Sequence, residues 1–250
     1  MQAYWTLVRR ELGSQFFSWI GYVIIAVVTF LIGLSFYTLL DTLNNDATPT
    51  PITELFYNTM YFWAILVLVA PVITMRSFAQ EKATGTFETL MTTPVSDAQV
   101  VLAKFSAAQL FYMLMWLPLL ACLLIVRHYS SDPTAFDVGT TAASFLGIFL
   151  IGAPYMALGC FASSLTRSQI IAAMISFAAS FSFFIVSFLS MNFASQTGWK
   201  AQLFTQIGMV EHMRDFARGV VDTRPVVFYL SLTGMFLFLT LKVVESRRWK

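Results

Sequence analysis

Long apolar runs alternate with short polar segments along the whole chain. Since about 20 apolar residues cross the hydrocarbon core of a bilayer, and a central charge costs about 2.5–3.5 kcal/mol on insertion, runs free of Asp, Glu, Lys and Arg are candidate spans. The sequence therefore predicts six membrane-spanning helices, the last of them short enough that Lys242 must extend toward the headgroups. The six runs are residues 19–40, 55–75, 105–126, 138–165, 168–191 and 225–241.

The composition supports an all-α membrane protein. Of the 250 residues, 58% are hydrophobic and only 11% are charged, whereas a soluble domain carries about 25% charged residues. The first run is too long for the apolar part of a cleavable signal, so we expect it to stay as an anchor. The formal net charge of +2 gives no reason to expect a nucleic-acid partner.

The distribution of Lys and Arg predicts the orientation. With the N-terminus in the cytosol, ten of the 15 basic residues fall on the cytosolic side, and four of the other five lie in one long outer segment. Short cytosolic segments carry an excess of Lys and Arg. We therefore expect both termini in the cytosol and the chain as one transmembrane domain over residues 1–250.

Residues 1–17 precede the first run and have an amphipathic pattern. Tyr4, Val8, Leu12 and Phe16 recur every four residues, which predicts a helix lying in the membrane interface. A cytosolic extension of the first span is the alternative.

The outer segment 192–224 also has helical spacing of apolar residues. Acidic and basic residues share its other face, and the spacing predicts the i,i+3 ion pairs Glu211–Arg214 and Asp215–Arg218. Gly219 suits the position after the last helical residue.

Two prolines and a set of small residues stand out within the runs. Pro118 and Pro154 predict kinks or breaks in the third and fourth helices. Ala172, Ser176 and Ser180 recur every four residues, which is typical of a helix-packing face. The further serines of this run, Ser182, Ser187 and Ser190, either pack in the same way or line a polar path.

The polar segment 76–104 is more elaborate than a simple connection requires. The second helix is expected to continue to Gly85, and Phe87, Leu90 and Met91 then form one apolar stripe of a short helix that ends at Pro94. A capping box follows at Ser96–Gln99. The stripe either docks a partner protein or lies flat among the headgroups.

The same segment resembles the cytosolic signature of ABC-2-type permeases, the membrane subunits of type 2 ABC exporters. Gln80 departs from the family pattern, which usually has an acidic residue there. The opening Arg10-Glu11-Leu12 and the closing stretch from His212 to Asp222 are similar to the short gliding-motility-associated permeases of the family. The signature reads Glu81-Lys82-x-x-Gly85-Thr86-x-Glu88-x-Leu90-x-x-x-Pro94-Val95.

The resemblance implies a site, partners and a location. Residues 87–92 would be a coupling helix in the groove of a separate ATP-binding subunit, and a second copy or a related permease would complete the transporter. The substrate would be lipid-like or amphipathic and the location the bacterial inner membrane; whether a periplasmic accessory protein joins is left open. The docking set is Glu81, Lys82, Gly85, Thr86, Phe87, Glu88, Leu90, Met91 and Pro94, and the translocation-path set is Ser176, Phe177, Ser180 and Phe181.

Chemistry-bearing motifs are absent from the sequence. None of the five lysines ends a glycine-rich phosphate loop, and His128 and His212 lack metal-ligand spacing. We therefore expect no catalytic residue, metal or cofactor on this chain, with ATP and Mg²⁺ on the partner. A non-transporting scaffold subunit is the alternative function.

Overall fold

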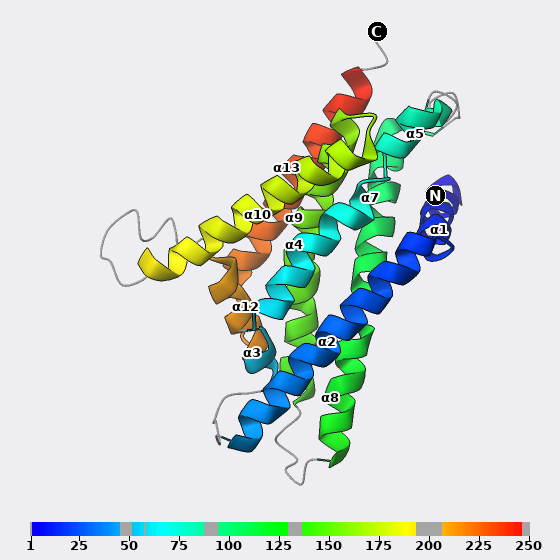
Figure 1. Ribbon diagram of the computed structural model, residues 1–250. Coiled ribbons are helices and arrows are strands. Elements are labelled where there is room, and N and C mark those ends of the chain that lie inside the picture. Colours follow the sequence, from blue (N-terminus) through cyan, green and yellow to red (C-terminus); the bar gives the residue numbers. More distant parts are fainter. Residues whose placement is uncertain are drawn as a thin grey trace.

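The computed structural model describes residues 2–45, 52–57, 59–87, 95–129, 137–193 and 207–246, and within these ranges the fold consists of helices without strands (Figure 1). The helices are α1 (Gln2–Phe16), α2 (Trp19–Asn45), α3 (Ile52–Tyr57), α4 (Met60–Thr74), α5 (Ala79–Thr84), α7 (Asp97–Leu114), α8 (Leu117–Tyr129), α9 (Val138–Leu165), α10 (Gln169–Phe193), α12 (Met209–Ala217) and α13 (Thr223–Ser246).

Six stretches of the described chain are long and apolar enough to cross a membrane, which confirms the predicted number of spans. The N- and C-terminal ends and α5 lie toward one end of the bundle, and α3 and the end of α8 toward the other (Figure 1). The stretches are Trp19–Thr42, Met60–Thr84, Asp97–Tyr129, Val138–Leu165, Gln169–Leu189 and Thr223–Ser246.

Helix α9 lies at the centre of the bundle and contacts α4, α7, α10, α12 and α13. Its glycines allow this close packing. A Cβ added at Gly159 would lie 2.0 Å from Thr74 Oγ1, and one at Gly152 would lie 2.2 Å from Tyr112 Cε1. Two neighbouring helices therefore approach α9 at positions where no larger residue fits.

The two predicted proline effects differ. The third span is broken between Leu114, where α7 ends, and Leu117, where α8 begins. Pro118 is the second residue of α8, in the first turn, where a missing N–H costs little. Helix α9 instead continues through Pro154 to Leu165.

Helix α1 packs against α7 with the face that the sequence marks as apolar. Val8 is buried and packs with Ala103 and Ala107, and the Tyr4 hydroxyl is 2.7 Å from Ser106 Oγ. Turn residues 17 and 18 separate α1 from α2, so α1 is not a continuous extension of the first span.

At the end of the bundle that holds α3 and α12, an ion pair links α3 to Arg218, the residue that follows α12. Arg218 Nη2 lies 2.7 Å from Glu54 Oε1, and Arg218 Nε donates to Oε2 at 2.9 Å. This carboxylate raises the pKa of Arg218. Arg214 Nε lies 3.8 Å from the same Glu54 Oε1.

The i,i+3 pairs expected within α12, Glu211–Arg214 and Asp215–Arg218, are therefore wrong in their partners. Both arginines turn toward the buried Glu54 side chain, which is 5% exposed. The helix stop is correct, since Gly219 has φ +83 and Val220 N donates to Asp215 O at 2.9 Å.

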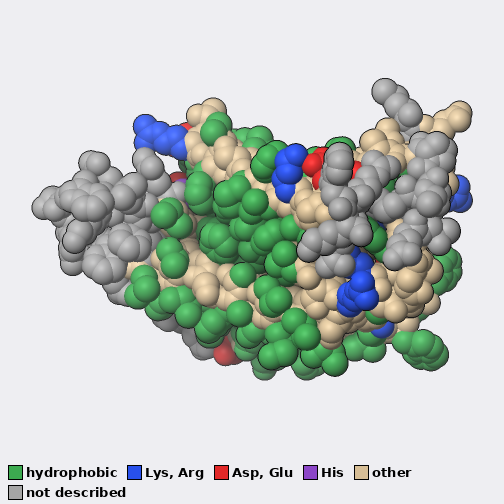
Figure 2. All heavy atoms as spheres, turned by 90° about the horizontal axis from the view of Figure 1, so that it is seen from above, with side chains coloured by type: hydrophobic (Ala, Val, Ile, Leu, Met, Phe, Trp, Pro, Cys, Tyr) green, Lys and Arg blue, Asp and Glu red, His purple; other side chains and the backbone are tan. Residues whose placement is uncertain are grey.

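The surface is largely apolar. Many large hydrophobic side chains are exposed on α2, α10 and α13, such as Phe30, Phe188 and Phe238. Figure 2, viewed from the end that carries the termini, shows broad hydrophobic areas and only scattered charged side chains. A protein surface of this kind is matched to lipid rather than water.

Candidate functional site

The connection from α4 to α5 is fixed to the central helix by one hydroxyl group. Ser163 Oγ accepts hydrogen bonds from Phe78 N and Ala79 N, each at 3.1 Å, and donates to Met75 O at 3.0 Å. The turn residues 75–78 would otherwise leave these backbone groups unpaired. This turn is therefore held against the end of α9.

Lys82 and Gly85 complete the α5 end of the segment. Lys82 is 7% exposed, donates from Nζ to the Ser164 carbonyl, and lies 5.3 Å from the centroid of the Phe87 ring. Gly85 has φ +75, a conformation that favours glycine, and it ends α5 at the predicted position. The expectation that the second helix continues unbroken to Gly85 is wrong, because turn residues 75–78 separate α4 from α5. Thr84, Gly85 and Thr86 are exposed.

The structure places Phe87 differently from the expectation that it faces a partner. Its side chain is 7% exposed and packs in a cluster with Phe78, Val100 and Val101. Phe87 and Lys82 therefore attach the segment to the protein's own helices in this conformation. Glu88, Leu90, Met91 and Pro94 lie outside the described residues, and the coupling helix at 87–92 stays a prediction.

The far side of the segment has the capping box that the sequence predicts. Ser96 Oγ accepts from Gln99 N at 3.3 Å, and Gln99 Oε1 accepts from Ser96 N at 3.4 Å. These two bonds provide acceptors for backbone N–H groups at the start of α7 that have no partner within the helix.

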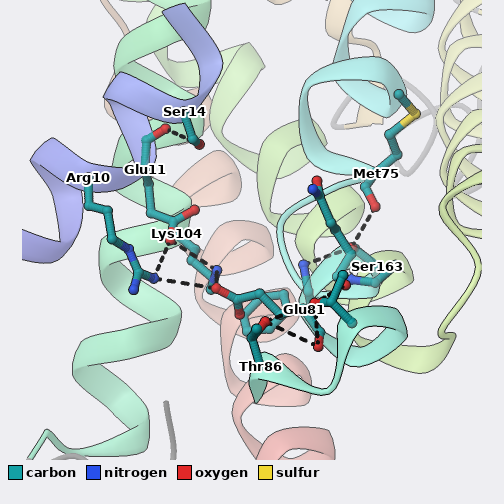
Figure 3. A network of polar contacts seen from close by, with 12 residues as sticks. Arg10, Glu11, Ser14, Met75, Glu81, Thr86, Lys104 and Ser163 are labelled. Carbon is teal, nitrogen blue, oxygen red and sulfur yellow. Dashed lines mark hydrogen bonds and ion pairs between the residues drawn. The ribbon is translucent and has the colours of Figure 1, made fainter. Parts of the chain in front are cut away.

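A four-residue charge cluster joins α1, α5 and α7 beside this segment (Figure 3). Lys104 Nζ lies 2.9 Å from Glu81 Oε1 and 3.2 Å from Glu11 Oε1. Arg10 Nη2 lies 2.7 Å from Glu11 Oε1 and 3.3 Å from Glu81 Oε1. The Lys104 side chain is only 2% exposed, and a buried ammonium group is tolerated only with such partners.

The sequence prediction included Glu81 in the docking set but missed its internal partners. Glu11 and Lys104 are separated by 93 positions, so no local spacing connects them. The signal that could have found Lys104 is its position one residue before the apolar run 105–126, where a charge at the start of a span needs a counter-ion.

A cavity of about 700 Å³ lies next to the cluster, between α1, α2, α4, α5 and α7. Arg10, Glu11, Glu81 and Lys104 line one part of it, together with Arg76. Arg76 Nη1 donates to Ser18 Oγ at 3.0 Å.

The four residues of the predicted translocation path lie on two sides of α10. Ser176 and Ser180 are 1% and 0% exposed, on a helix that packs against α4 and α9. Phe177 and Phe181 are 40% and 44% exposed and stack with their centroids 5.9 Å apart. The serines thus occupy the packing position, while the aromatic rings face outward.

The fold defines the class of the protein. Six long apolar helical stretches among the described residues and a largely hydrophobic surface make it a multi-pass membrane protein. A family model described as ABC-2 family transporter protein matches residues 5–248, nearly the full length of the chain. The chain therefore belongs to the ABC-2 transporter family. Membership of this family supports a role as a permease in membrane transport. A search of curated proteins finds no significant match.

Proposed function

We propose that this chain is the permease subunit of an ATP-driven exporter and that a separate ATP-binding subunit docks on the segment between α5 and α7. The observation that carries the proposal is the construction of this segment. Helix α5, which leads into it, lies toward the same end as both termini (Figure 1), residues 84–86 beside it are exposed, and the segment is bordered by a left-handed glycine and a capping box. Family members generally work with an ATP-binding subunit.

Helix α5, which leads into the segment, is tied to two spans, and this arrangement suits a part that receives force. Ser163 bonds hold the turn before α5 to α9. Glu81 on α5 pairs with Lys104 of α7. Displacement of the segment by the ATP-binding subunits would therefore reach both spans. Nucleotide binding would then shift the population between inward- and outward-open states.

We further propose that two copies, or this chain and a related permease, pair in the bacterial inner membrane. Helices α2 and α10 carry many of the exposed large hydrophobic side chains. The stacked Phe177 and Phe181 rings and the exposed Phe188 form an aromatic surface on α10. A path along such a surface suits a lipid-like or amphipathic substrate, carried without catalysis or a cofactor on this chain. ATP and Mg²⁺ belong to the partner, and a periplasmic accessory protein would be an additional subunit.

Co-purification tests the docking site. Leu90→Asp places a charge on the predicted apolar stripe and is expected to abolish co-purification with the cognate ATP-binding subunit and the stimulation of its ATP hydrolysis. Val220→Asp is the matched control, because Val220 is 55% exposed near the opposite end of the bundle. An intact complex with Leu90→Asp, or equal loss with both variants, would remove the docking assignment.

A distance measurement separates a transporter from the alternative, a non-transporting scaffold that binds the same ATP-binding subunit. Spin labels at residue 88 of two paired copies should change their separation when ATP and Mg²⁺ are added to the complex. A scaffold subunit would bind its partner with no such change.

A further inference from the structure

Arg76 is an unbalanced positive charge in the cavity beside the charge cluster. Arg10 and Lys104 are neutralised by Glu11 and Glu81. Among the described residues, however, no carboxylate lies within 4.0 Å of Arg76, and its printed hydrogen bond goes to the neutral Ser18 hydroxyl. Its Nε is buried without an acceptor in the described part of the chain. A half-buried guanidinium in this state calls for an anion.

The rest of the cavity lining is chemically mixed. Gln15 Oε1 and Glu81 Oε2 are buried acceptors without a donor among the described residues. Hydroxyl and amide side chains of Ser14, Ser77, Gln80, Thr84 and Thr86 also line it. The apolar part of the wall comes from α2, α4 and α7. It consists of Ile20, Ile24, Val72, Ile73 and Phe111. The cavity therefore offers a cation, two acceptors and an apolar surface within about 700 Å³, a volume in the range of known small-molecule sites, about 300–1,000 Å³.

We infer from the helix ends beside the cavity that it lies near the headgroup level of a bilayer. Arg76 follows the end of α4 by two residues, and Ser18 directly precedes α2. Both helices belong to candidate membrane spans. Basic pockets between spans at this level are suited to lipid phosphates.

We propose that this cavity binds one anionic glycerophospholipid, with its phosphate on the Arg76 guanidinium and an acyl chain along the wall of Ile24 and Phe111. Hydroxyl groups of a glycerol headgroup would donate to Gln15 and Glu81. The bound lipid contacts α1, α2, α5, α7 and the turn after α4 together, so it stabilises the packing of α1 beside the helix that carries Glu81. The site does not depend on the proposed exporter function.

Lipid binding to the full-length, delipidated protein in detergent tests this proposal. Phosphatidylglycerol is expected to raise the melting temperature more than phosphatidylcholine with the same acyl chains, and native mass spectrometry should show one preferentially bound phosphatidylglycerol. Arg76→Gln should weaken that binding roughly tenfold, the loss of one charge-assisted contact, whereas Arg76→Lys should keep most of it. Arg9→Gln is the matched control, since Arg9 is exposed on α1 and does not line the cavity.

The proposal is overturned if the two lipids act equally, or if Arg76→Gln and Arg9→Gln lose the same affinity, since the attraction would then be general surface charge. A third arm uses soluble glycerol 1-phosphate at matched concentration. If this compound alone gives the full thermal shift, the cavity is a site for a soluble phosphate and not for a lipid. Because each variant's melting temperature is measured without ligand, a failure to fold is distinguished from a loss of binding.

Discussion

Glu54 is almost fully buried at one end of the bundle and Lys104 at the other, and each is neutralised by residues far away in the sequence. Glu54 accepts two hydrogen bonds from Arg218, 164 positions later. Lys104 lies between Glu11 and Glu81. Removing one partner leaves the other charge buried and unpaired, which destabilises the fold. These ion pairs therefore hold together segments that are far apart along the chain.

We predict that Glu54→Gln lowers the melting temperature of the purified protein by about 5 °C, because the charged pair that joins α3 to α12 is lost. Glu211→Gln is the control and should shift it by less than about 1 °C. Glu211 lies on the same α12 helix, but no ion pair in the described structure uses it. Thermal unfolding in one detergent measures both. If Glu211→Gln is as damaging as Glu54→Gln, the local pair expected from the sequence holds after all.

The residues at which sequence reasoning failed share a physical cause. Arg214 and Arg218 have suitable partners at i,i+3, but such exposed pairs contribute only about 0.2–0.5 kcal/mol. The buried Glu54 carboxylate is a better partner because it lacks water to solvate its charge. Phe87 likewise lies on an apparently exposed stripe, yet its ring packs with Phe78 and Val100. Neither partner can be read from local spacing.

At the scale of elements, α9 determines how tightly the bundle packs. It contacts α4, α7, α10, α12 and α13. It is also the most buried of the candidate spans in the described chain, with 78% of its apolar stretch buried. Backbone-to-side-chain approach at Gly152 and Gly159 makes this possible. Small residues at helix interfaces provide most of the packing in membranes, where apolar burial drives little.

We predict that Gly159→Ala destabilises the protein by about 1–3 kcal/mol, the usual cost of overpacking, because the new methyl group would overlap Thr74. Gly234→Ala is the matched control, since a Cβ there meets nothing within 4 Å. That variant should leave stability unchanged or raise it by up to about 1 kcal/mol through helix propensity. Denaturation in mixed micelles compares the two. Equal stability of both variants would contradict the close contact between α4 and α9.

Elements specified by local signals were predicted well. The run 138–165 and helix α9 have the same bounds, and the stop at Gly85, the capping box at Ser96 and the break before Pro118 all occur. Each depends on charge-free length, backbone conformation or a neighbouring side chain. The packing of α1 on α7 depends on a distant helix, and its amphipathic pattern fits a membrane surface equally well.

The whole molecule has two ends of different character. One holds both termini, α5 and the charge cluster, and the other holds the Glu54–Arg218 pair (Figures 1 and 3). The six candidate spans of the described residues agree with termini on one shared side. The excess of Lys and Arg in the sequence predicts that this side is cytosolic. The proposed docking segment would then lie where an ATP-binding subunit could reach it.

We predict that a membrane-impermeant maleimide added to spheroplasts labels Tyr129→Cys and Val221→Cys but not Thr84→Cys or Ser246→Cys. The background chain has Ala at Cys122 and Cys160. All four positions are exposed, so permeabilised membranes should give full labelling and serve as the control. Labelling of Thr84→Cys from outside would invert the orientation and remove the proposed docking site from the cytosol.

The Ser163 hydroxyl has a mechanical consequence for the whole bundle. One oxygen atom joins the last turn residues of the second span to the first residue of α5 and anchors both to the fourth span. A displacement of α5 would therefore pull on α9 through these hydrogen bonds. Because α9 contacts most other spans, the proposed docking of an ATP-binding subunit would act on the bundle as a whole and not on α5 alone.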